Sequence, residues 1–117
     1  MALLSNIAVL LVALLQLWFL MVEMFLWRTP KVKRAFGLSD EFAEQSAVLA
    51  KNQGLYNGFL SAGIVYGVVT HMPSMTVFML ACVVVAGVYG AATVSPKIFF
   101  LQSMPAVAAI VLSYLGM

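Results

Sequence analysis

The sequence predicts an all-α integral membrane protein, built as a bundle of four transmembrane helices in a single domain over residues 1–117. Hydrophobic residues make up 64% of the chain and charged residues only 9%, against about 25% in ordinary soluble domains. Apolar runs of about 20 residues, the length that crosses a bilayer, recur four times. A water-soluble fold of this size cannot bury so much apolar surface, so lipid is the expected solvent for most of the chain.

The four predicted spans are separated by polar or turn-forming connections, and they cover residues 3–27, 53–71, 74–94 and 98–116. The turn signals between the last three spans are His71-Met72-Pro73-Ser74 and Ser95-Pro96-Lys97. The first run is longer than the apolar region of a signal peptide, and no basic residue precedes it. We therefore expect the first helix to remain in the membrane.

Basic residues set the predicted orientation, because all six fall in the first and third connections: Arg28, Lys31, Lys33, Arg34, Lys51 and Lys97. The positive-inside rule assigns both connections to the cytoplasm. Both termini are then outside, and the expected location is the bacterial cytoplasmic (inner) membrane, as a multi-pass protein.

The first connection contains a predicted short cytoplasmic helix that starts at Ser39. Acidic residues follow Ser39 closely and Lys51 lies near the end, which matches the helix dipole. This helix either lies near the headgroups or continues directly into the second span. The basic cluster before it either sets topology alone or also attracts anionic lipid, at about 1 kcal/mol per charge, through Arg28, Lys31, Lys33 and Arg34.

Small residues four apart predict close helix packing in the second and third spans. The second span has two such pairs, Gly54 with Gly58 and Gly63 with Gly67, and the third has Gly87 and Gly90, each paired with an alanine. We expect these faces to pack within the chain. A seam between two copies, and hence a homo-oligomer, is the alternative.

Glu23 is the one charged residue inside the first apolar run. A charge at the bilayer centre costs about 3 kcal/mol or more, so an intramembrane acid is a candidate proton or ligand site. Other polar side chains are expected near it on the cytoplasmic side: Asn52, Gln53, Tyr56, Asn57 and Gln102, with Gln16 about 10 Å deeper on the same helix face. An equally open interpretation makes Glu23 interhelical hydrogen-bond glue, at about 1 kcal/mol per contact.

Other chemistry has little support in the sequence. Cys82 is the single cysteine and His71 the single histidine, so neither a metal site nor a disulfide is expected, and no cofactor is implied. A net charge of +2 does not suggest nucleic acid as a partner. Without a second intramembrane carboxylate, a Cys/His pair or a phosphate loop, we do not expect an enzyme.

Several segments resemble a family of small bacterial membrane proteins, the domain of unknown function 1304. They are EMFLW at 23–27, FGLS at 36–39, NQGLYNGFL at 52–60, AGVYGAAT at 86–93, and the pair Gln102 and Pro105. The resemblance covers essentially the whole chain and implies four membrane helices, but no established activity. The family-like residues are Glu23, Trp27, Asn52, Gln53, Gly54, Tyr56, Asn57 and Gly58. The resemblance also implies a histidine where this chain has Gln16, so a His–Glu relay is absent here.

Two functional hypotheses follow. The first is a small proton- or cation-linked transporter that uses Glu23, with a layout similar to the small multidrug resistance family. The second is a non-catalytic protein that binds membrane lipid or a partner and uses Glu23 only as glue. The identity of any small-molecule or ion ligand stays open.

Overall fold

The computed structural model describes residues 2–93 and 97–117. All regular structure in these ranges is helical, which confirms the all-α prediction. Two stretches within them, Leu3–Leu26 and Pro73–Ala92, are long and apolar enough to cross a membrane, and Phe99–Tyr114 is a shorter apolar helix. The expected end of the third span at Val94 and the Ser95-Pro96 turn lie outside the described residues.

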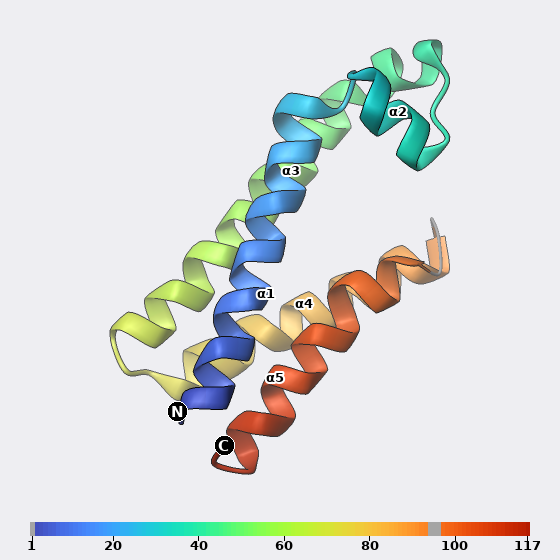
Figure 1. The fold of residues 1–117 in the computed structure, drawn as a ribbon. Coiled ribbons are helices and arrows are strands. Elements are labelled where there is room, and N and C mark those ends of the chain that lie inside the picture. Colours follow the sequence, from blue (N-terminus) through green and yellow to red (C-terminus); the bar gives the residue numbers. More distant parts are fainter. Residues whose placement is uncertain (1, 94–96) are drawn as a thin grey trace. The chain divides into compact units, whose positions relative to one another are not determined.

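Five α-helices and two π-helical segments, η1 and η2, follow one another along the described chain (Figure 1). In order they are α1 (Leu3–Met21), η1 (Val22–Leu26), α2 (Pro30–Phe36), α3 (Asp40–Val69), α4 (Pro73–Thr93), η2 (Phe99–Ser103) and α5 (Met104–Tyr114).

The helix predicted to begin at Ser39 is the first part of α3. The Ser39 hydroxyl oxygen accepts a hydrogen bond from the Phe42 N–H at 3.0 Å, so Ser39 caps the helix. The helix then continues without interruption to Val69. Of the two predicted arrangements, direct continuation into the second apolar run is therefore the one observed.

The separate short helix between the first two apolar runs is α2, which the sequence analysis did not predict. Thr29 caps it by accepting from the Val32 N–H, Pro30 occupies its first turn, and Gly37 ends it at a φ of 67°. Proline at the start and a left-handed glycine after the end are the usual helix boundaries. Thr29, Pro30 and Gly37 are thus the local residues that set the bounds of α2.

The chain divides into two compact units. The first unit takes the chain up to Leu15 and from Leu60 onward, and the second unit is Gln16–Phe59. That residues 1–117 form a single domain stays a prediction. The core of the first unit is aliphatic and draws on α1, α3, α4 and α5: Val9, Val12, Ala13, Ile64, Leu80, Val83, Ala106 and Ala109.

In the first unit, α4 and α5 lie side by side, and both chain ends meet (Figure 1). The Leu4 N–H donates to the Met117 carbonyl oxygen at 2.8 Å, and the Ser61 hydroxyl donates to the Ala13 carbonyl oxygen at 2.9 Å. Between α3 and α4 the chain turns at His71, whose φ is 55°. This turn coincides with the one predicted at residues 71–74.

Pro105 explains the irregular helix geometry just before it. A proline inside a helix lacks an N–H and its ring clashes with the carbonyl four residues earlier, here that of Leu101. The backbone responds with the π-helical segment η2, and the Met104 N–H bonds to the Phe99 carbonyl five residues back. The Ser103 hydroxyl then donates to the Val84 carbonyl oxygen at 2.8 Å, which joins η2 to α4.

The predicted packing glycines lie at contacts between helices of the chain. Gly54 and Gly58 face Leu20 in the second unit, while Gly63 and Gly67 face α4 in the first. Gly87 is against Ser103, and Gly90 is against Ile98. A Cβ on Gly87 would lie 2.9 Å from the Ser103 backbone nitrogen, so backbone meets backbone there.

Replacing Gly87 by alanine should destabilise the protein by about 1–3 kcal/mol, because the new methyl group overpacks against rigid backbone. Gly63→Ala is the matched control, since the atoms it meets belong to the flexible Met79 side chain. Thermal unfolding followed by circular dichroism should show a lower midpoint for Gly87→Ala alone. Equal midpoints for the two variants would contradict the assigned contact.

Candidate functional site

Glu23 lies in η1, where it is partly buried and accepts a hydrogen bond from the side-chain amide of Asn57. The Asn57 side-chain nitrogen donates to Glu23 Oε1 at 2.5 Å, and Asn57 itself is only 6% exposed. Both residues belong to the second unit, so the contact joins η1 to the middle of α3. An amide N–H to a carboxylate is a charge-assisted hydrogen bond, roughly twice as strong as one between neutral groups.

Gly54 permits this contact by letting α3 approach η1 closely. A Cβ on Gly54 would lie 2.6 Å from Met24 Cγ and 3.2 Å from both Glu23 Cβ and the Leu20 carbonyl oxygen. Gly54 and Asn57 are three residues apart and therefore share one side of α3. The glycine removes the side chain that would otherwise separate Asn57 from Glu23.

The other three residues of the predicted polar stripe do not join Glu23. Asn52, Gln53 and Tyr56 are exposed, and the Tyr56 ring instead packs edge-on against Phe59 at a centroid distance of 5.9 Å. The buried side of α3 in this unit follows small residues and ends at Asn57: Ala43, Ala47, Ala50, Gly54 and Asn57. That alternating spacing of four and three was visible in the sequence and would have singled out Asn57.

Gln16 and Gln102 occupy different environments. Gln16 is fully buried, and within the described part of the chain neither its Nε2 nor its Oε1 has a hydrogen-bond partner. Gln102 lies in η2, within the first unit, where its Cβ lies beside Gly87. Each π-helical segment thus carries one of the predicted polar residues, and such segments often occur at functional sites.

Trp27 connects three elements of the second unit, a role that the sequence analysis missed. Its indole N–H donates to the Ser46 hydroxyl of α3 at 3.0 Å, and its ring lies 5.9 Å from that of Phe36 in α2. Trp27 directly follows η1, so it fixes the end of the segment that holds Glu23. The sequence offered only a terminal aromatic, which is also the pattern of a membrane-interface residue.

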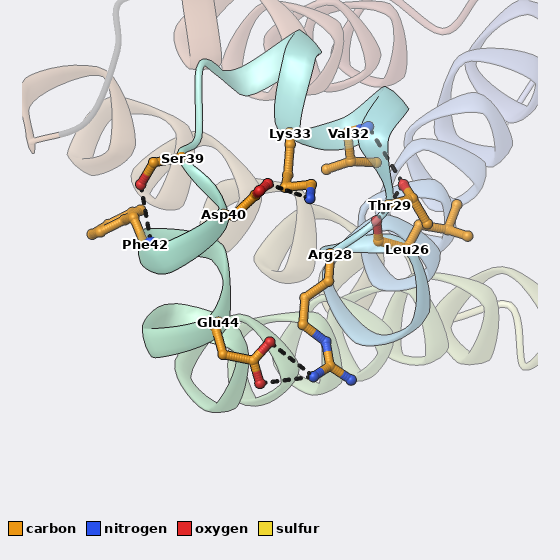
Figure 2. Close-up of polar contacts among 9 residues, drawn as sticks. All are labelled: Leu26, Arg28, Thr29, Val32, Lys33, Ser39, Asp40, Phe42 and Glu44. Carbon is orange, nitrogen blue, oxygen red and sulfur yellow. Dashed lines mark hydrogen bonds and ion pairs between the residues drawn. The ribbon is translucent and has the colours of Figure 1, made fainter.

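Two of the four clustered cations are neutralised by acids of α3 (Figure 2). Arg28 contacts both carboxylate oxygens of Glu44 at 3.0 and 3.2 Å, and Lys33 contacts Asp40 at 2.6 Å. The hydrogen bond and charge of Lys33 hold the pKa of the Asp40 carboxyl below its ordinary value. A lowered pKa means that this pair stabilises the fold above the ordinary pKa of Asp, and that the effect is lost as the pH falls through the lowered value.

The described residues contain no group of side chains that could together bind a metal ion. Across residues 2–93 and 97–117, no three His, Cys, Asp or Glu side chains gather as metal ligands. Cys82 is a free cysteine in α4, partly buried.

Over residues 2–93 and 97–117 the regular structure is all helical, and two stretches are long and apolar enough to cross a membrane. One of them carries Glu23, which is hydrogen-bonded to an amide. The chain belongs to the family described as "Protein of unknown function (DUF1304)", which matches residues 10–114 and confirms the family resemblance. It is also 30% identical over 118 residues to the "Uncharacterized protein YpaA" of Lactococcus lactis subsp. lactis (strain IL1403), across 97% of this chain and 99% of that protein. No solved structure matches the chain.

Proposed function

We propose that the chain is a multi-pass protein of the bacterial cytoplasmic membrane, with four spans and both termini outside. The sparse burial of its apolar helices supports this placement. Only 28% of the apolar window in Leu3–Leu26 and 22% of that in Pro73–Ala92 are buried, whereas the core helix of a soluble protein is mostly buried. Side chains such as Leu3, Phe25, Phe78 and Val85 are each more than 60% exposed, an arrangement suited to contact with lipid.

The first unit favours an even number of crossings. The bond between Leu4 and Met117 places both chain ends together, and Asn6 and His71 line one small cavity, which brings the α3–α4 turn to the same end. That turn contains no Lys or Arg, whereas Lys97 precedes η2 at the far end of α4. This distribution agrees with an outer end without cations and a cytoplasmic end with them.

The helices differ in length relative to the hydrocarbon core of a bilayer: α3 is longer than the core, and the last helix is shorter. The 30 residues of α3 extend about 45 Å, so its polar first turns can lie outside the hydrocarbon core. The 16 residues of Phe99–Tyr114 extend only about 24 Å, against a core of about 30 Å. The fourth span is therefore shorter than the hydrocarbon core. It should lie nearly perpendicular to the membrane plane, and the bilayer should be thinner around it.

Cysteine labelling should report this topology. In a Cys82→Ser background, Met117→Cys should react with a membrane-impermeant maleimide in spheroplasts, because the C-terminus is outside. Lys31→Cys should react only after the membrane is permeabilised, since the positive-inside rule places α2 in the cytoplasm. Labelling of Lys31→Cys in intact spheroplasts would contradict the topology, and the signal after permeabilisation serves as its control.

Within this frame, we propose a small proton- or cation-linked transporter in which Glu23 is the binding group. The observation that carries the proposal is the hydrogen bond between Asn57 and the Glu23 carboxylate, inside an apolar helix. An ionisable residue in such a helix is costly, and those retained usually mark proton or ion pathways.

The contact provides a physical link between binding and helix position. A bound proton or cation neutralises Glu23. The hydrogen bond from the Asn57 amide to Glu23 then weakens from charge-assisted to ordinary strength. The contact between η1 and α3 is therefore weaker when Glu23 has bound a proton or cation than when Glu23 is ionised. Since η1 is π-helical, its backbone can exchange bonds to the fifth preceding residue for bonds to the fourth, which would turn Glu23 about the helix axis.

Glu23→Gln should remove proton-linked behaviour while leaving the fold intact, because glutamine keeps a hydrogen-bonding group but cannot ionise. Infrared spectra of the protein in lipid should show a carboxyl band that changes between protonated and ionised forms with pH and is missing from the variant. Proteoliposomes carrying an internal pH dye should lose proton flux with it.

Glu41→Gln is the matched control, because Glu41 is an exposed acid of α3 outside the apolar runs. It should keep both the band and the flux. A Glu23 band fixed in one form over the whole pH range in which the protein is folded would instead support hydrogen-bond glue. Flux that survives Glu23→Gln would also contradict the transport proposal.

A second candidate function, the binding of anionic lipid, is favoured by the two remaining cations of α2. Lys31 and Arg34 are exposed, lie three residues apart on one side of the helix, and have no ion-pair partner among the described residues. The opposite side carries buried Val32. Because α2 begins four residues after η1 ends, a spanning α1 would place α2 at headgroup level.

Neutralising this pair should weaken the binding of phosphatidylglycerol or cardiolipin by about 30-fold, from about 1 kcal/mol per charge. Native mass spectrometry of the Lys31→Gln/Arg34→Gln variant would measure the loss. The Arg28→Gln/Lys33→Gln variant has the same net charge but removes cations that Glu44 and Asp40 already neutralise, so it should retain the lipid. Equal losses in both variants would show a general charge effect and no local site.

A further inference from the structure

Gln16 is a polar residue whose burial the proposed function does not yet explain. It is fully buried in α1, yet neither its amide nitrogen nor its amide oxygen has a partner among the described residues. A primary amide offers two donors and one acceptor, and a buried amide without bonds destabilises the protein. A residue of this kind therefore indicates a bound group that both accepts and donates.

The position of Gln16 relates it to the Glu23 contact. The two residues are seven apart, which places them on one side of the helix and about 10 Å apart along its axis. Leu20 lies between them, and its side chain fills the space over Gly58, where a Cβ would be 2.7 Å from Leu20 Cδ1. Gln16 and the Glu23–Asn57 pair are thus two polar positions on one face, separated by one aliphatic side chain.

We propose that Gln16 binds an internal water molecule. Water is the ligand that fits the amide, because it accepts from Nε2 and donates to Oε1 at once. A cation would satisfy only the oxygen and an anion only the nitrogen. Val12 and Leu20, one turn away on either side, carry no charge that could neutralise an ion.

This inference deepens the proposed function, because it gives protons leaving Glu23 a hydrated position on the side away from the basic residues. It rests on the proposed function only for that role. The water itself follows from the Gln16 amide and can be detected whether or not Glu23 changes protonation.

Nuclear magnetic resonance of the full chain in detergent micelles tests the water directly. The Gln16 side-chain NH₂ should show a cross-peak to water in both NOESY and ROESY spectra, with the opposite relative signs of a long-lived internal water. Gln45, an exposed glutamine of α3, is the matched control and should show only the exchange pattern of bulk water. A Gln16 NH₂ with cross-peaks to protein or detergent protons and none to water would overturn the proposal.

A variant supplies the second measurement. Gln16→Met keeps the length of the side chain but removes the groups that would hold the water, so the variant should show slower proton flux in proteoliposomes. Unchanged proton flux in Gln16→Met would overturn the role of this water in proton movement. A water cross-peak together with a Glu23 band that does not titrate would uphold the water and reject the transport proposal, which keeps the two failures distinct.

Discussion

The close approach of helices that is permitted by small side chains is the constraint on which the rest of the structure depends. Van der Waals contact and hydrogen bonds between helices both require the backbones to come near. In the second unit Gly54 brings α3 to η1, and in the first unit Gly87 brings α4 to η2. Polar contacts follow at the same points, since Asn57 reaches Glu23 and Ser103 reaches the Val84 carbonyl.

The sequence predicted the elements that depend on local chemistry. Helical apolar runs, the Ser39 cap and the turn at His71 each follow from a few neighbouring residues, and the structure has all three. The partners of Glu23 depend instead on which side of α3 faces inward. Spacing by four linked Gln53 to Asn57 correctly as helix neighbours, but it could not show that Asn57 is buried while Gln53 is exposed. The sequence also offered no basis for predicting the π-helical segment η1. For η2 the basis was Pro105, which requires a local departure from α-helical bonding.

The four clustered cations of the second unit differ in whether an acidic side chain pairs with them. The sequence showed a cluster of cations, whereas the structure divides it into Arg28 and Lys33, which hold α3 through Glu44 and Asp40, and Lys31 and Arg34, which stay exposed. Exposed pairs of this type contribute little to stability individually, with a median near 0–1 kcal/mol. Here they join Arg28, just before α2, and Lys33, within α2, to the first turns of α3 (Figure 2).

The π-helical geometry of η1 also affects how the chain can tolerate changes in length. In an α-helix, losing one residue rotates everything beyond it by about 100°, which would turn an apolar face away from its neighbour. A π-helical segment accommodates one residue more than α-helical bonding needs, so a deletion between Glu23 and Trp27 would convert η1 to an α-helix. The directions of α1 before it and of Trp27 after it would then be kept.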